Sequence, residues 1–284
     1  MIKNWDKIIE RNYMHMKKTI ISLLMVCLFV TGLTGCNKSD VDKTDTKKQV
    51  ITIGTDMYPP YAYFDENGTA TGIDVELAKE AFKRIGYRVK FVQINWEKKK
   101  ELVESGKIDC IMSCFSMKGR LDDYRWAGPY IASRQSVVVN KNSDIYSLSD
   151  LAGKNVVVQS TTKPEEIFLN HDDPRIPELG NLISLGHREL IYTFLSKGYV
   201  DAAGAHEESI IQYMKDYDAD FRILDEPLCV VGIGAAFAKD DNRGICEKLD
   251  KTFKAMRKDG TEKKIIGKYL DNPEKYLEVD DLGY

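Results

Sequence analysis

Cysteine and histidine are the side chains of this sequence that could support redox or metal chemistry, and the 284-residue chain contains six and four of them. Beyond residue 36 the thiols are Cys110, Cys114, Cys229 and Cys246. Cys110 and Cys114 fall in one predicted strand, which places their Cα atoms about 13 Å apart, beyond disulfide reach. Cys229 and Cys246 leave two alternatives open: a bridge between them, or two small buried thiols, which is the commoner arrangement.

The spacing of these residues does not match a metal site. Zinc sites use closely spaced pairs, yet no CxxC or His-x-x-x-His pattern is present. The histidines are scattered, at positions 15, 171, 187 and 206. We therefore expect neither a metal centre nor another cofactor.

The first 35 residues have the pattern of an export signal. Residues 16–18 (Met-Lys-Lys) carry positive charge, residues 20–30 form an apolar run, and Leu-Thr-Gly-Cys follows at 33–36. This order predicts a secretory signal peptide over residues 1–35. Its apolar run, residues 20–30, is too short to remain in the membrane as a spanning helix. A complete signal begins at Met16, so translation starting there is an alternative to Met1.

Leu-Thr-Gly-Cys resembles the lipobox of bacterial lipoproteins, whose cysteine becomes the acylated first residue of the mature chain. The resemblance implies that Cys36 anchors the protein to a membrane, on its extracytoplasmic face. The alternative is a plain secreted protein with an incidental cysteine. Residues 37–49 (NKSDVDKTDTKKQ) are polar and lack apolar periodicity, so residues 36–49 are expected to form a lipid-anchored flexible tether.

The charge of the mature chain argues against a nucleic-acid partner. Residues 1–35 hold five Lys or Arg and two Asp or Glu, which leaves 36 basic and 42 acidic residues and a net charge of −6. A mildly acidic chain without a basic patch does not suit a polyanion. About 235 residues after the tether suffice for one large or two modest domains.

The residues after the tether alternate between strand and helix patterns. Strands are predicted at 50–55, 88–93 and 108–114, and helices at 72–85 and 98–105. A strand at 133–140 lacks a following helix, and a new series then begins. Its predicted strands are 155–159, 200–203 and 221–224, and its predicted helices are 164–170, 190–197 and 208–216.

A last strand at 230–238 returns toward the first series and precedes helices at 244–257 and 261–269. This order predicts an α/β protein with two lobes joined by two crossing strands. Lobe 1 is expected to comprise residues 50–135 and 231–284, and lobe 2 residues 136–230. Such a body places a ligand in the cleft between its lobes, at the carboxyl ends of the strands.

Seven short motifs follow one another along the chain: Gly-Thr-Asp at 54–56, GIDVEL at 72–77, GKID at 106–109, SMKGR at 116–120, Gly-Pro-Tyr at 128–130, DLAGK at 150–154 and KDGT at 258–261. In this order they resemble the extracellular solute-binding proteins, family 3, of polar amino acid ABC importers. Together they span nearly all of residues 50–270. The resemblance implies a type II periplasmic-binding-protein-like fold that binds an amino acid.

The resemblance further implies how the ligand carboxylate is held. It would contact Arg120, the Ser116 hydroxyl and the backbone at Cys114, because a guanidinium offers a bidentate fork to a carboxylate. The alternative for Arg120 is a surface ion pair with Asp122 or Asp123. From lobe 2, the Ser160-Thr161-Thr162 turn would bind the same carboxylate at the start of a helix. A simple N-cap, followed by Pro164 in the first helical turn, is compatible with that role.

Aromatic and acidic residues would surround the ligand side chain. The family positions are Tyr58 and Trp96, with Phe115 and Tyr61 nearby as further walls. Ser113 is also expected in the binding site. Trp96 in the core is the alternative. Asp56 occupies the position that often contacts the distal group of the ligand, where a carboxylate would favour a polar or cationic side chain; it could equally cap the next turn.

Two departures from the family pattern affect the binding site. The family usually has an aspartate that accepts the ligand ammonium five residues after the Asp of the VDA motif, and His206 stands at that position here. Either Glu207 holds the ammonium after a shift in register, or His206 indicates a different kind of ligand. One residue fewer than usual separates Ser116 from Arg120.

The resemblance implies a non-catalytic, monomeric receptor whose lobes close around the ligand before it docks on an ABC permease. An enzyme of the cyclohexadienyl dehydratase type, with Glu207 as its acid, is an alternative on the same fold. A solute sensor that works without a transporter is another.

Overall fold

The computed structural model describes residues 49–171, 173–280 and 282. The predicted signal peptide, Cys36 and the tether up to residue 48 lie outside these residues. The described residues all belong to one compact unit, Lys47–Tyr284.

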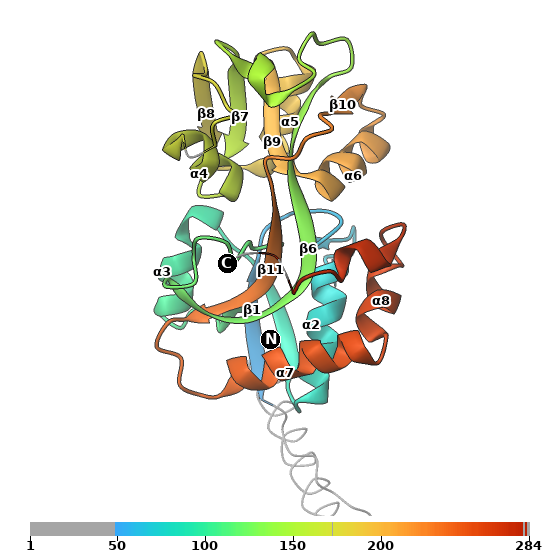
Figure 1. The fold of residues 1–284 in the computed structure, drawn as a ribbon. Coiled ribbons are helices and arrows are strands. Elements are labelled where there is room, and N and C mark those ends of the chain that lie inside the picture. The colour runs from blue at the N-terminus through green and yellow to red at the C-terminus, as the bar shows by residue number, and fades with distance from the viewer. Residues whose placement is uncertain (1–48, 172, 281, 283–284) are drawn as a thin grey trace, which may run out of the picture. The chain divides into compact units, whose positions relative to one another are not determined.

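One nine-stranded sheet is the scaffold of the described residues, with the strand order β4-β1-β5-β11-β6-β9-β7-β8 and β10 paired with β6 (Figure 1). Its strands are β1 (Val50–Thr55), β4 (Arg88–Gln93), β5 (Cys110–Ile111), β6 (Tyr124–Asn140), β7 (Asn155–Gln159), β8 (Asn181–Leu185), β9 (Ala202–His206), β10 (Phe221–Ile223) and β11 (Cys229–Ala238). A separate hairpin pairs β2 (Tyr63–Phe64) with β3 (Ala70–Thr71).

The helices are α2 (Ile73–Arg84), α3 (Lys99–Glu104), α4 (Lys163–Asn170), α5 (Arg188–Ser196), α6 (Glu207–Tyr217), α7 (Ile245–Lys258) and α8 (Thr261–Ile266). Short 3-10 turns are η1 (Trp96–Lys98), η2 (Leu148–Leu151) and η3 (Pro273–Tyr276). None of the helices in the described part is long and apolar enough to cross a membrane.

Two long antiparallel strands, β6 and β11, run between the two halves of the sheet (Figure 1). We call β1, β4 and β5 with α2, α3, α7 and α8 the first lobe, and β7 to β10 with α4, α5 and α6 the second lobe. Both contain parallel strands joined by helices. The predicted α/β fold with two crossing strands is therefore confirmed.

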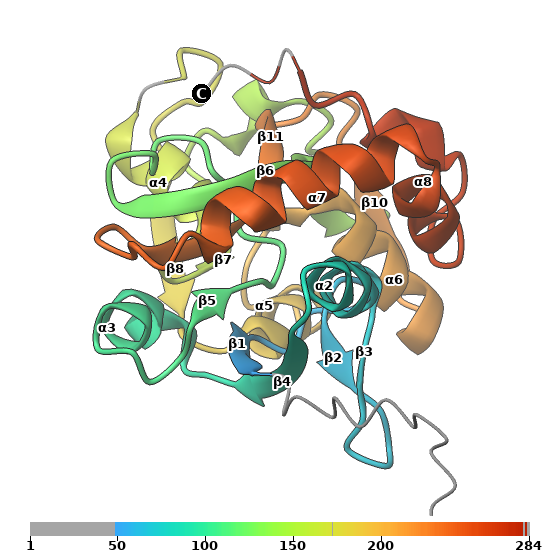
Figure 2. The same ribbon diagram turned by 90° about the horizontal axis from the view of Figure 1, so that it is seen from below.

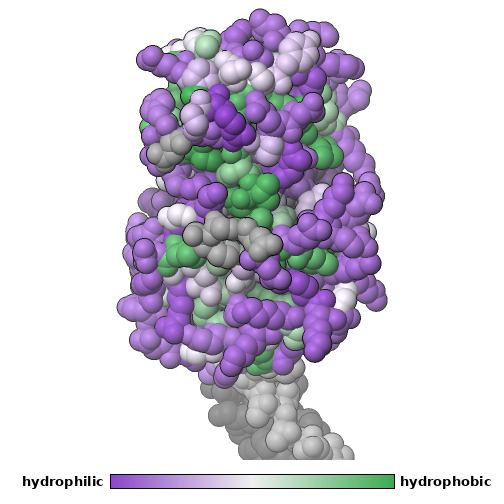
Figure 3. Space-filling model, in the orientation of Figure 1, coloured by the Kyte–Doolittle hydropathy of each residue, from purple (hydrophilic) through white to green (hydrophobic). Residues whose placement is uncertain are grey.

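Both faces of the sheet are covered by apolar packing. In the first lobe, Ile53 of β1 is buried against Leu77 and Phe82 of α2, and α3 lies on the opposite side of β1 (Figure 2). In the second lobe, Val156 and Val158 belong to one buried cluster and Val157 to another. This alternation along β7 is typical of a strand covered on both sides. The exposed face in Figure 3 is mostly hydrophilic, with apolar residues near its middle.

Three local sequence predictions were wrong. The strand predicted at 108–114 is only Cys110–Ile111, because the backbone bends and Cys114 adopts a φ of 50°. The first crossing strand begins at Tyr124, not at 133. β8 was missed, since its sequence NLISL is short and stands among polar turns. Among the described residues Cys110, Cys114, Cys229 and Cys246 are free thiols, so the alternative of a Cys229–Cys246 bridge is not found.

Candidate functional site

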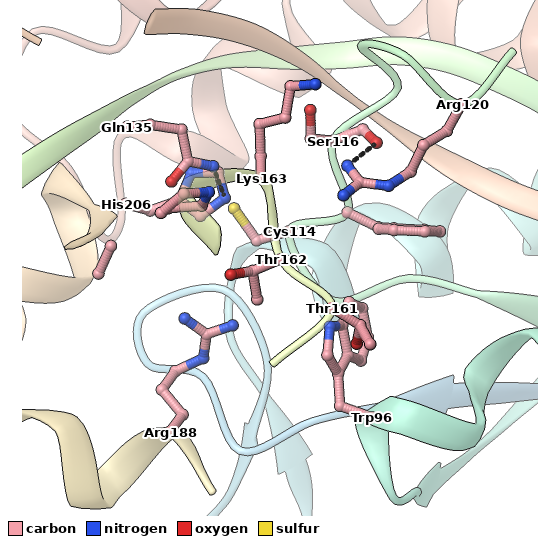
Figure 4. Close-up of a pocket in the computed structure, with 13 residues that line it drawn as sticks. Trp96, Cys114, Ser116, Arg120, Gln135, Thr161, Thr162, Lys163, Arg188 and His206 are labelled. Carbon is pink, nitrogen blue, oxygen red and sulfur yellow. Dashed lines mark hydrogen bonds between the residues drawn. The ribbon is translucent and has the colours of Figure 1, made fainter. Parts of the chain in front are cut away.

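A pocket lies where the two lobes and the crossing strand β6 meet (Figure 4). It contains about 310 Å³ not filled by protein atoms, part of it open to solvent. Its walls combine predicted and unexpected residues: Trp96, Cys114, Phe115, Ser116, Arg120, Gln135, Thr161, Thr162, Lys163, Pro164, Arg188, Ala205 and His206. Eight predicted site residues therefore come together, whereas Asp56, Tyr58, Ser113, Ser160 and Glu207 are not among those walls.

Arg120 connects the two lobes. The turn from Met117 to Arg120 directs its side chain into the pocket, where the side chain is 12% exposed. Its Nη2 lies 3.0 Å from Glu166 Oε2 on α4, and the other oxygen of Glu166 pairs with Lys163. The alternative pairing of Arg120 with Asp122 or Asp123 is not found among the described residues: Asp123 pairs with Lys100, and Asp122 lies 4.0 Å from Lys239. The Glu166 carboxylate therefore already binds the Arg120 guanidinium, which is the group expected to bind the ligand carboxylate.

The backbone at Cys114 is not free to bind a ligand carboxylate. Its N–H donates to Asp74 Oδ2 over 2.5 Å, which fixes the left-handed conformation of Cys114. Burial raises the pKa of the Asp74 carboxyl to about 7, although the bond from Cys114 acts in the opposite direction. In contrast, the Ser116 hydroxyl is buried and has no hydrogen-bond partner among the described residues.

The 160–162 turn places two threonines on the pocket. Thr161 has a φ of 58°, its N–H donates to Glu165 Oε2, and its Oγ1 accepts from Lys99 Nζ over 2.7 Å. Thr162 is the N-cap residue of α4, but its hydroxyl donates to Gln159 O instead of accepting from the helix. The Ser160 N–H pairs with Leu185 O on β8. The N–H groups of Ser160 and Thr161 and the hydroxyl proton of Thr162 are therefore used within the protein, whereas the Thr161 hydroxyl accepts from Lys99 and keeps a proton that it can donate.

Trp96 and Phe115 form an aromatic wall, with ring centroids 5.3 Å apart in an edge-to-face arrangement. Tyr58 lies behind this pocket: it is 1% exposed, and its hydroxyl accepts from the backbone N–H of His206 over 3.1 Å. The guanidinium of Arg188 covers the Tyr58 ring at 3.4 Å. Tyr58 therefore supports Arg188 instead of the ligand side chain.

Asp56 joins the lobes outside the pocket. Its Oδ2 accepts from Gln159 Nε2 over 2.8 Å and lies 3.8 Å from Arg188 Nε. Its N–H donates to Ser113 Oγ over 3.0 Å. The Ser113 hydroxyl therefore holds the backbone of Asp56, directly after β1. The carboxylate of Asp56 contacts protein groups from both lobes.

His206, at the end of β9, faces the pocket, and Glu207 does not. His206 Nδ1 lies 2.8 Å from Ser133 Oγ, and Nε2 lies 2.7 Å from Gln135 Nε2. Burial first, and then the charges of Arg188 and Arg120, lower the pKa of His206 well below its ordinary value, so the ring is neutral at pH 7. Glu207 begins α6 and binds Arg134 and Ser136.

Sequence reasoning missed Lys99, Gln135, Lys163 and Arg188. Lys99 lies in the helix predicted at 98–105, whose polar sequence does not indicate a site. Arg188 follows β8, the strand that was not predicted. Burial, and next the charge of Arg120, lower the pKa of Lys99 to about 7. Among the described residues, no three His, Cys, Asp or Glu side chains gather closely enough to hold a metal ion.

Comparisons with known proteins give a consistent result. The sequence profile of the bacterial extracellular solute-binding proteins, family 3, matches residues 51–272. The histidine-binding periplasmic protein of Escherichia coli (strain K12) is 33% identical over 266 residues, covering 90% of this chain and 98% of that protein.

Solved structures agree with this result. An ancestral arginine-binding protein bound to arginine is 28% identical, with a TM-score of 0.70 over 78% of this chain and 99% of that chain. The ancestral amino acid-binding protein AncCDT-1, a precursor of cyclohexadienyl dehydratase, is 26% identical, with a TM-score of 0.69 over 79% and 96% of the two chains.

Proposed function

We propose, since the chain belongs to the bacterial extracellular solute-binding proteins, family 3, that it is an extracytoplasmic receptor for an amino acid or a close relative. The observation that supports this proposal most strongly is that both lobes contribute to one pocket. Arg120 and Ser116 line it from the first lobe, and Thr161 and Thr162 from the second. Guanidinium and hydroxyl groups suit a carboxylate. Lobe 1 is proposed to comprise residues 50–135 and 231–284, and lobe 2 residues 136–230.

Delivery to an ABC importer permease completes this proposal. The protein is proposed to be a monomer, tethered through acylated Cys36 and residues 37–49. Family membership supports the permease partner, and the sequence Leu-Thr-Gly-Cys supports the anchor. A sensor that works without a permease is the alternative, and loss of uptake on deletion of the gene would exclude it.

The proposed receptor performs no chemistry on its ligand. Glu207, the acid considered for a dehydratase, pairs with Arg134 at 3.0 Å outside the pocket walls. The other nearby acid, Glu208, is buried against Tyr61 and Ser133, and burial raises its pKa. Formation of an aromatic product from prephenate or arogenate by the purified protein would contradict the proposal that the receptor is not an enzyme.

A thermal-shift panel of the proteinogenic amino acids, cystine, ornithine and small dicarboxylates tests ligand binding. A compound at a hundredfold its dissociation constant adds roughly 2.7 kcal/mol to the free energy of unfolding. Arg120→Ala is expected to lose the shift, and Arg88→Ala, which removes an exposed arginine of the first lobe, is expected to retain it. No shift with any compound, or an undiminished shift in Arg120→Ala, would contradict the proposal.

A further inference from the structure

The pocket contains buried hydrogen-bond donors that no described residue satisfies. Trp96 Nε1, Ser116 Oγ and Arg188 Nε are all buried and have no hydrogen-bond partner in the described part of the chain. Gln135 Oε1 is an unpartnered acceptor in the same walls. Because buried polar groups without partners are costly, these atoms indicate what a ligand supplies. Trp96 Nε1 and Arg188 Nε can only donate and the Ser116 hydroxyl can donate as well, so a ligand with acceptor oxygens would satisfy these three groups.

Arg188 is the clearest of these groups. The residue is 6% exposed and lines the pocket, and its Nε has no hydrogen-bond partner among the described residues. The carboxylate oxygen at 3.8 Å from its Nε, Asp56 Oδ2, is too distant for a hydrogen bond and accepts from Gln159. Asp56 therefore balances part of the Arg188 charge but does not accept a hydrogen bond from Nε, and an anionic oxygen from a ligand would satisfy that donor.

The positive groups lie on opposite sides of the space. In Figure 4 the guanidinium groups of Arg120 and Arg188 face one another across the pocket, one from each lobe. Lys163 is the third cation in the walls, and none of the wall residues is Asp or Glu. Glu166 is shared by Arg120 and Lys163, which leaves one of these two charges without a carboxylate of its own.

The pocket walls provide few groups that could bind the ammonium group of a ligand. His206 is neutral, and its two ring nitrogens already lie within hydrogen-bond distance of Ser133 and Gln135. Glu207 is bound to Arg134 and Ser136 outside those walls. The nearby Arg120 and Arg188 repel a positive charge at the same time.

We propose that the ligand is a small carboxylate with two anionic groups, one held by Arg120 and Ser116 and the other by Arg188, with no requirement for an ammonium. This inference rests on the proposed solute-binding function and names its substrate class. The first carboxylate takes the place of Glu166 on Arg120. The second supplies an acceptor oxygen to Arg188 Nε, which has no hydrogen-bond partner among the described residues.

Calorimetric titration of the purified full chain with succinate, glutarate, L-glutamate, L-glutamine and L-arginine tests the inference. L-Glutamine is the neutral match to L-glutamate. A dicarboxylate should bind about tenfold or more tightly than L-glutamine, as expected for a charge-assisted hydrogen bond. Arg188→Gln should weaken the dicarboxylate about tenfold and L-glutamine much less. Lys215→Gln removes an exposed charge from the same lobe and should change neither.

The outcomes separate the two proposals. Tighter binding of L-glutamine or L-arginine than of every dicarboxylate would overturn the inference and leave the receptor function standing. An unchanged preference in Arg188→Gln would overturn the role of Arg188. Absence of binding by all five compounds and by the wider amino acid panel would overturn both. The wild-type ratios decide the ligand class even where Arg188→Gln does not fold.

Discussion

Lys99 makes the stability of the protein depend on pH. The residue is 5% exposed, and its Nζ donates to the backbone and side-chain oxygens of Thr161 on the other lobe. Burial, followed by the charge of Arg120, lowers the pKa of Lys99 from 10.5 to about 7. Between these values Lys99 binds its proton in the unfolded chain but not in the folded protein, so its contribution to the free energy of unfolding rises with pH, whereas Glu262, whose pKa burial raises to about 8, acts in the opposite direction. Lys99→Met should abolish this rise.

The size of the effect follows from the two pKa values. One proton contributes about 1.4 kcal/mol per pH unit, so the wild-type protein should gain about 2 kcal/mol from Lys99 between pH 7 and about pH 9. At higher pH the buried Tyr58 and Tyr61 act in the opposite direction. Burial raises the pKa of both hydroxyls, so the unfolded chain loses their protons first.

Urea denaturation at pH 7 and pH 9 measures the difference. The wild-type gain in unfolding free energy should exceed the gain of Lys99→Met by about 2 kcal/mol. Lys100→Met is the matched control, because Lys100 is 48% exposed and pairs with Asp123 at the surface; it should behave like the wild type. Equal gains in wild type and Lys99→Met would refute the assignment of a buried, easily deprotonated lysine.

Three further predictions concern the ligand, the turn before α2 and the start of α6. An anionic ligand should raise the pKa of Lys99, so calorimetry near pH 7.5 in buffers of different ionisation enthalpy should detect proton uptake; no uptake would contradict this. Gly72→Ala should cost about 3 kcal/mol of unfolding free energy, measured in urea, because φ is 115° and a Cβ would collide with the Tyr61 carbonyl. Glu207→Gln should change ligand affinity less than twofold, since Glu207 pairs with Arg134 outside the pocket walls; a tenfold loss would restore the register-shift hypothesis.

Periodicity predicted the elements whose burial is regular. The helix at 72–85 was recognised from apolar spacing, and α2 buries those positions. The strand predicted at 108–114 is too long. An apolar run does not show that the Cys114 N–H donates to Asp74 and that the chain turns there. β8 alternates too weakly to be recognised without its parallel partner β7.

The site was partly predictable for a related reason. Arg120, Ser116 and the 160–162 turn belong to short motifs, so the sequence indicates them. Arg188 enters the site because α5 of the second lobe packs it on Tyr58 of the first lobe. No short sequence pattern predicts a contact between residues so far apart in the chain. The choice between His206 and Glu207 depends on where β9 ends and α6 begins, which a sequence defines least well.

A crystal structure of the protein with the most stabilising compound of the panel tests the central claim most directly. The account predicts the compound between the lobes, with carboxylate oxygens on Arg120 and Ser116 and a second anionic group on Arg188. A compound bound elsewhere, such as beside Tyr192 and Tyr213 in the groove between α5 and α6, would contradict it.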